Sequence, residues 1–249
     1  MSVEHFRPSE QLIGKSVVEV VSLLPTFPWY IKVGGRHIEA ARIASLVVVD
    51  YDTQEPKVND DIFGSIPVTP GVPISIKELK PRLTPPWPGR TTGLASLVHL
   101  DLSQWQQDRQ FIYLGKPLAH IPLIDIDLEI PYLSREELLA LIKNEVKDKT
   151  EADRGLILAS GKQNFHFIGT ERLFTDEQLV TFLSLCLLME GPRGEPLVDS
   201  RWAGHSLTLM RHRADLGGWS VYDFKDRFAT LRISTSERKP NLPKVVAVL

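Results

Sequence analysis

The order of the segments after residue 111 constrains the fold more than any other feature of the chain. Residues 121–130, IPLIDIDLEI, alternate between apolar and acidic side chains, which predicts a strand, and the preceding FIYL predicts another. Residues 156–160 and 165–169 predict two more strands, and the polar loop GKQN between them indicates a hairpin. With a helix after residue 130 and another after residue 169, this order matches a split β-α-β plan. We therefore predict an α+β protein.

Two capping boxes mark where those helices begin. Ser134 is followed by Glu137 and Thr175 by Gln178, the spacing at which a hydroxyl and a carboxyl or amide group satisfy the first backbone N–H groups of a helix. Further strands are predicted over 205–210, 219–222 and 229–235. Residues 111–249 are thus predicted to form an RNA-recognition-like β-α-β-β-α-β unit, a plan that by itself names no function.

Residues 1–110 are predicted to form an additional N-terminal α/β region. Helical spacing of apolar residues predicts a helix over 10–24, and strands are expected over 30–33 and 45–50. Residues 56–88 hold eight of the 18 prolines, so loops and short edge strands are expected there and no regular helix. The region is either an accessory domain or a part of the same functional unit.

Charge and cysteine content exclude several classes of protein. The formal net charge is -2, so any contact with nucleic acid must come from a local basic patch. The single cysteine, Cys186, can form neither an internal disulfide nor a thiolate zinc site. The most apolar segment, 179–189, is shorter than the roughly 20 residues that span a bilayer. We therefore expect a cytoplasmic protein with no membrane partner and no signal peptide.

The strand over 121–130 carries the first candidate site. Asp125, Asp127 and Glu129 alternate along it and therefore point to one face, where a divalent cation would relieve their mutual repulsion. A solvated strand end is the alternative explanation. A second acidic pair, Asp50 and Asp52, also follows an apolar run. We reject that pair because the proline-rich stretch separates it from the hairpin described next.

The hairpin after residue 159 gathers groups that bind phosphates. Ser160, Lys162 and His166 supply a hydroxyl and two cationic side chains beside a flexible glycine. An ordinary polar turn would have the same composition. Asp199, which follows the apolar pair Leu197-Val198, is a further candidate, although isolated aspartates of this kind are common.

Basic residues are concentrated in the last third of the chain. Arg232 lies on a predicted strand and Ser236 follows it, an arrangement that suits a polyphosphate or a nucleic-acid backbone. A solvated strand face is the alternative. The residues that could contact a nucleic-acid strand are Arg211, Arg213, Arg238 and Lys239.

Taken in order, these motifs resemble those of the archaeo-eukaryotic primase superfamily. The family pattern of an apolar run with Asp-x-Asp, then Ser-Gly-x-x-Gly-x-His, then apolar-Asp, corresponds to Leu123–Asp127, Ser160–His166 and Val198–Asp199. The chain departs from the pattern at Asn164, which stands where the family has glycine, and it lacks a cysteine-rich zinc element. The first motif fits in two registers, Asp125 with Asp127 or Asp127 with Glu129.

The resemblance implies a role for each of these residues. Asp125, Asp127 and Asp199, with Glu129 as a further possibility, would hold two Mg²⁺ or Mn²⁺ ions. The groups implied to bind the nucleotide are Ser160, Lys162, His166, Arg232 and Ser236. Asp125, Asp127, Asp199 and His166 would be the catalytic set, and the four basic residues of the last third would contact the template.

The implied function is that of a DNA primase or primase-polymerase in residues 111–249. Such an enzyme joins NTPs or dNTPs on a single-stranded nucleic-acid template, and any helicase would be a separate partner. Two alternatives remain open. One is a non-catalytic RNA-recognition-like binding module, in which Phe165 and Phe167 would stack on bases. The other is a degenerate primase-like protein without chemistry.

Overall fold

The computed structural model describes most of the chain. The ranges that it describes are 10–33, 36–38, 41–52, 62–84, 90–101, 118–127, 130–152, 154–161, 163–207, 210–216, 219–226, 228–235 and 240–249. The predicted strand FIYL lies outside them. Within these ranges, no helix combines the length and the apolar character needed to cross a bilayer.

The first part of the chain contains short helices and the strands of a large sheet. Its elements are η1 (Glu10–Leu12), α1 (Val17–Leu23), η2 (Leu24–Thr26), β1 (Tyr30–Val33), β2 (Arg36–Ile38), β3 (Ile43–Asp52), β4 (Ile62–Pro67), α2 (Ile76–Arg82) and β5 (Arg90–Leu100). The predicted helix over 10–24 is interrupted at Gly14, whose φ of 88° lies in the left-handed region. A capping box at Ser16 and Glu19 then starts α1.

The second part contains the longer helices. Its elements are β6 (Leu118–His120), β7 (Leu123–Asp127), α4 (Arg135–Lys149), β8 (Gly155–Ala159), β9 (Asn164–Gly169), β10 (Arg172–Leu173), α5 (Asp176–Cys186), α6 (Ser200–Leu207), β11 (Met210–Leu216), β12 (Trp219–Asp226), β13 (Thr230–Arg232) and β14 (Lys244–Val248). Both predicted capping boxes are confirmed at the starts of α4 and α5. At the first of them, the hydrogen bond from the Ser134 N–H lowers the pKa of Glu137.

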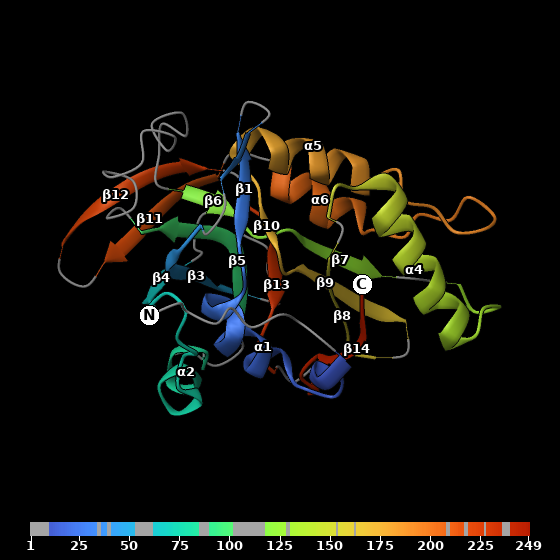
Figure 1. Cartoon of the computed structure of the whole chain (residues 1–249), viewed down its shortest axis with the longest axis horizontal. Helices are drawn as coiled ribbons and strands as arrows, with labels where there is room; N and C mark the ends of the chain where they lie inside the picture. Colours follow the sequence, from blue (N-terminus) through green and yellow to red (C-terminus); the bar gives the residue numbers. More distant parts are fainter. Residues whose placement is uncertain are drawn as a thin grey trace.

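The strands of the described ranges form three sheets. A four-stranded sheet has the order β14-β8-β9-β7, and a three-stranded sheet the order β10-β1-β2. A seven-stranded sheet has the order β12-β11-β4-β3-β5-β13, with β6 paired to β5. In Figure 1 the four-stranded sheet lies in the half of the molecule next to α4, and the β11–β12 hairpin extends from the opposite end. The seven-stranded sheet combines strands from both sides of residue 110.

The α+β class is confirmed, whereas the RNA-recognition-like arrangement is not. Strand β9 lies antiparallel between β7 and β8, as a split β-α-β unit requires. In the RNA-recognition plan the last strand would pair with the first, here β7. Instead β14 pairs with β8 at the other edge, and β7 has an isolated bridge between Ile126 and Val198.

Two local predictions need correction. The proline-rich stretch does contain a helix, α2, in which Pro81 sits in the last turn and the fully buried Leu79 anchors the helix to the core. Residues 205–207 belong to α6 and not to a strand.

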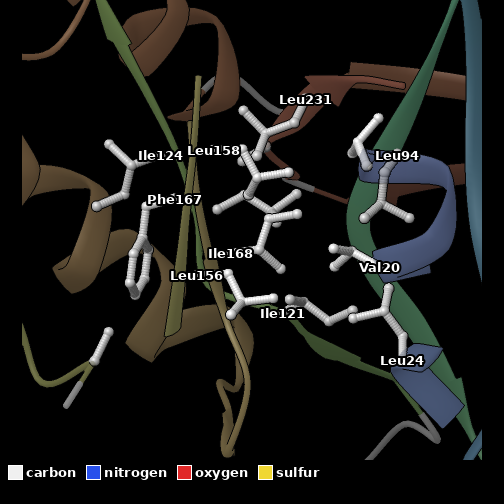
Figure 2. Close-up of a cluster of buried hydrophobic side chains, with 14 of the residues drawn as sticks. Val20, Leu24, Leu94, Ile121, Ile124, Leu156, Leu158, Phe167, Ile168 and Leu231 are labelled. Carbon is white, nitrogen blue, oxygen red and sulfur yellow. The ribbon is translucent and has the colours of Figure 1, made fainter. Parts of the chain in front are cut away.

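The core lies between the four-stranded and the seven-stranded sheets and continues under the helices. Figure 2 shows Leu156, Leu158 and Ile168 on the side of the β8–β9 ribbon that faces Val20 and Leu94, with Ile124 and Phe167 on the other side. Buried residues of α4 and α5 belong to the same cluster. Cys186 is part of it, and burial raises the pKa of its thiol, so the lone cysteine is a packing residue.

A buried polar network joins the seven-stranded sheet to the start of α5. His120 is fully buried; its Nδ1 lies 3.3 Å from Ser96 Oγ and its Nε2 lies 2.7 Å from Asp176 Oδ1. These residue types also build hydrolase triads. Ser96, however, has no exposed surface, and its Oγ accepts a hydrogen bond from the Ala229 N–H. The network is therefore structural.

We expect His120→Ala to lower the free energy of unfolding by about 2–4 kcal/mol. The substitution removes both side-chain hydrogen bonds, leaves the Ser96 hydroxyl with fewer partners and opens a cavity. Urea unfolding followed by circular dichroism measures the change. His205→Ala on the exposed face of α6 is the matched control, for which a change within about 0.5 kcal/mol is expected. Equal effects of the two variants would contradict the structural role.

Candidate active site

Asp125 and His166 meet on adjacent strands. Antiparallel pairing of β7 with β9 sets Asp125 opposite His166, and the pairing of β9 with β8 sets His166 opposite Leu158. Directly opposed side chains in an antiparallel sheet share one face. We call the face that carries Asp125, Asp127, Asn164 and His166 the site face.

The site face changes from apolar to polar along β7. Leu123 is fully buried, Asp125 is partly exposed and Asp127 is exposed. The site face is thus part of the inter-sheet core at the start of the strand and reaches solvent at its end. The three positions lie two residues apart, so strand alternation keeps them on the same side.

The His166 imidazole faces the Asp125 carboxylate. Nε2 of His166 lies 3.5 Å from Oδ1 of Asp125, with 6% of the histidine side chain and 34% of the aspartate side chain exposed. The histidine is therefore enclosed by the fold, while the carboxylate reaches the surface. This arrangement can hold a cation at the carboxylate and can orient the imidazole beside it.

Asp199 reaches the same place from a distant part of the sequence. The antiparallel bridge between Ile126 and Val198 puts Asp199 next to Asp125 in register. The Asp199 carboxylate also caps α6, because its Oδ1 accepts the Arg201 N–H at 2.8 Å and its carbonyl oxygen accepts the Ala203 N–H at 3.0 Å. The cap holds Asp199 at the edge of β7.

The three aspartates supply the ligand type of a magnesium or manganese site, but their side chains are not gathered closely enough to surround an ion. Carboxylate oxygens are the ligands that these hard cations prefer. Among the residues that the structure describes, no group of three or more His, Cys, Asp or Glu side chains lies close enough together to hold a metal ion. The fit to a metal therefore rests on donor chemistry and strand register. Glu129 lies outside the described residues.

The hairpin between β8 and β9 extends the site. The Ser160 N–H donates to the Asn164 carbonyl at 3.1 Å, so Ser160 and Asn164 are paired at the tip, one step beyond Leu158 and His166. Ser160 is half-buried. The predicted phosphate ligand Lys162 lies outside the described residues.

Basic residues that the sequence patterns missed lie beside the same hairpin. Ser160 and Gly161 form part of the wall of an open groove of about 730 Å³, to which Arg135 and Lys244 contribute cationic side chains. Arg135 opens α4, and Lys244 begins β14. Arg135 and Lys244 lie far apart in the sequence, and the pairing of β14 with β8 brings them to the same groove.

Arg232 is used internally. It is 7% exposed; Nη1 donates to the Ser234 carbonyl at 2.7 Å and Nη2 to the Asn241 carbonyl at 3.1 Å. These bonds tie the end of β13 to the segment that leads into β14. Its assignment to a nucleotide stays a prediction. Ser236, Arg238 and Lys239 lie outside the described residues, as do the side chains of Arg211 and Arg213 on β11.

Comparison with known proteins identifies the segment that carries these motifs. Residues 112–211 match the model of a family described as AEP-like, archaeo-eukaryotic primase 1D-like. No curated protein and no solved structure matched the chain. The matched segment contains all three motifs of the resemblance, with Asp125, Asp127, Ser160, His166 and Asp199. Residues 112–211 of this chain are thus similar to the archaeo-eukaryotic primase superfamily.

Proposed function

We propose that the chain is a primase or primase-polymerase that adds nucleotides to a growing strand on a single-stranded template. The observation that carries the proposal is the assembly of Asp125, His166 and Asp199 on neighbouring segments of one sheet. These residues come from three separate motifs of a nucleotidyltransferase superfamily. Two carboxylates and an enclosed histidine that adjoin at the solvent end of a core strand are typical of a functional site.

Asp125, Asp127 and Asp199 are proposed to hold Mg²⁺ or Mn²⁺. Magnesium is usually bound by one or two carboxylates, with water and substrate phosphates completing its shell, so a preassembled three-ligand group is not required. Such ions, when bound, would favour deprotonation of the attacking 3′-hydroxyl and neutralise charge on the phosphates. The Asp199 cap on α6 keeps the third carboxylate at the strand edge.

His166 and Ser160 are proposed to bind the phosphates of the incoming nucleotide. Both lie on the β8–β9 hairpin beside the carboxylates, and Nε2 of His166 already points toward the Asp125 side. An imidazole N–H and a hydroxyl donate hydrogen bonds to phosphate oxygens, and donors held by the fold need little reorganisation as charge shifts. The two groups would orient the triphosphate relative to the carboxylates.

A binding module of RNA-recognition type fits less well. Such a module stacks bases on aromatic side chains of its central strands. Phe165 and Phe167, the aromatic residues of β9, are fully buried and contribute to the core. They therefore offer no stacking surface.

The proposal is tested by nucleotide incorporation. The full chain is incubated with a single-stranded DNA template, labelled dNTPs or NTPs and Mn²⁺ or Mg²⁺, with and without a primer. Template-dependent labelled products are expected. The reaction without a primer separates primer synthesis from extension. Absence of products under all these conditions, together with absence of nucleotide binding, would favour a degenerate primase-like protein.

Metal binding is expected to stabilise the fold. At Mn²⁺ concentrations about tenfold above the dissociation constant, with a non-hydrolysable dNTP analogue present, the melting temperature should rise by about 3–6 °C, since a ligand that binds only the folded state stabilises it. Asp127→Asn should remove most of the rise because it removes one anionic ligand. Asp148→Asn, an equivalent change at an exposed position of α4, should leave the rise intact. Equal responses of the two variants would contradict the metal assignment.

A further inference from the structure

Asn164 is the position at which the hairpin departs from its superfamily pattern. In Ser160–His166 the residue two before the histidine is asparagine where that pattern has glycine. A glycine brings only backbone to a ligand, whereas asparagine adds a carboxamide that both donates and accepts hydrogen bonds. The departure therefore adds a functional group at this point of the hairpin.

Strand register puts Asn164 between two candidate ligand groups. It is paired with Asp127 of β7 on one side, and its carbonyl oxygen accepts the Ser160 N–H on the other. Because opposed side chains share a face, the Asn164 carboxamide lies on the site face beside Asp127. It is one step further toward solvent than the pair formed by Asp125 and His166.

The carboxamide of Asn164 is accessible and uncommitted within the described part of the chain. The residue is half-buried, and its side chain makes no hydrogen bond to any residue that the structure describes. At the N-termini of α4 and α5, by contrast, the hydroxyl of each capping residue accepts a backbone N–H hydrogen bond. The Asn164 NH₂ is thus a hydrogen-bond donor without a partner among the described residues, and it lies beside a carboxylate. This arrangement suits a ligand whose oxygens both bind metal ions and accept hydrogen bonds, as those of a triphosphate do.

We propose that Asn164 is a specificity-determining residue whose carboxamide NH₂ donates a hydrogen bond to the triphosphate of the incoming nucleotide. The inference rests on the proposed function and adds a contact to it. Phosphate is the favoured partner because Asn164 is flanked by Ser160 and Asp127, the two groups assigned to the triphosphate and to its cations. A neutral donor at this position binds phosphate without adding to the charge of the site.

The test measures binding rather than turnover. A fluorescent, non-hydrolysable dNTP analogue is titrated into the full-length wild-type chain in Mn²⁺, and the matching NTP analogue and the deoxynucleoside monophosphate serve as comparison ligands. For Asn164→Ala we expect triphosphate affinity to fall about tenfold, equally for the ribo and deoxy forms, from loss of one hydrogen bond to a charged group. Monophosphate affinity should change less than twofold.

Two variants sharpen the test. Asn164→Asp keeps the size of the side chain but opposes a carboxylate to the phosphates and to Asp127, so triphosphate affinity should fall by at least about 100-fold. Gln163→Ala removes the neighbouring amide of the same hairpin and is expected to leave affinity unchanged. Thermal unfolding of each variant establishes that the protein tested is folded.

The outcomes separate this inference from the proposed function. An unchanged triphosphate affinity in Asn164→Ala overturns the inference. So does a loss confined to the ratio between ribo and deoxy forms, which would make Asn164 a sugar contact. If the wild-type chain itself binds no triphosphate, the proposed function fails first and this inference fails with it.

Discussion

Replacing Asp125 by asparagine is expected to lower template-directed incorporation about a thousandfold while the protein stays folded. Asparagine keeps the shape of the side chain but removes the negative charge that the proposed metal site requires. A thousandfold loss corresponds to about 4 kcal/mol of transition-state stabilisation, the scale expected when a catalytic cation is lost or misplaced. The effect is measured as the rate at which labelled nucleotide is added to a primer on a template under single-turnover conditions.

The expected loss of activity needs a control that separates the loss of a metal ligand from a change at His166. Asp125 faces the enclosed His166, so a loss of activity has two explanations: a lost metal ligand or a displaced histidine. The two explanations differ in their metal dependence, because only loss of a ligand should raise the Mn²⁺ concentration needed for half-maximal activity. Asp148→Asn on α4 changes the net charge equally and should retain full activity. An Asp125→Asn variant with near wild-type activity would remove the catalytic assignment.

Local signals in the sequence predicted the elements around the site well. The capping boxes at Ser134 and Thr175 and the hairpin between β8 and β9 depend on residues within a few positions of one another. Because these interactions are local, contacts with the rest of the chain rarely change the structure that they favour. Helix α2 was not predicted because it depends on long-range packing: burial of Leu79 in the core outweighs the cost of Pro81 in the helix.

Long-range pairing could not be predicted from those signals. The sequence order suggested a last strand next to β7, but β14 pairs with β8, and β3 to β5 join β11 to β13 in one sheet. Periodicity tells which residues are buried and does not tell which strand lies beside which. The internal hydrogen bonds of Arg232 to Ser234 and Asn241 could not be predicted from those signals either.

Only the relative placement of some predicted site residues can be compared with the structure. The resemblance implied that Asp125, His166 and Asp199 belong to one catalytic set, and the pairing of β7 with β9 and the bridge at Val198 bring them to neighbouring segments. The cap that Asp199 forms on α6 could not be foreseen, because the sequence there predicted no helix. The metal roles of the three aspartates stay predictions.

Gly155→Ala is expected to destabilise the protein by about 3 kcal/mol, although it adds a single methyl group. Gly155 begins β8 beneath the ring of Phe167, which is fully buried. A Cβ at this position would overlap the Phe167 ring and lie 2.7 Å from the carbonyl oxygen of Ile168. Both obstacles belong to β9, so relief requires the β8–β9 pairing to shift, and overpacking of this kind costs about 1–3 kcal/mol or more.

The measurement is the melting temperature, which should fall by about 6–12 °C for a chain of this size. Gly204→Ala is the matched control, because a Cβ there meets no atom within 4 Å and alanine favours the helix α6. That variant should be unchanged or slightly more stable. Combining Gly155→Ala with Phe167→Leu should cost less than the sum of the two single changes, since the smaller side chain vacates the space that the methyl group needs. Strict additivity would mean that the Phe167 ring is not the obstacle.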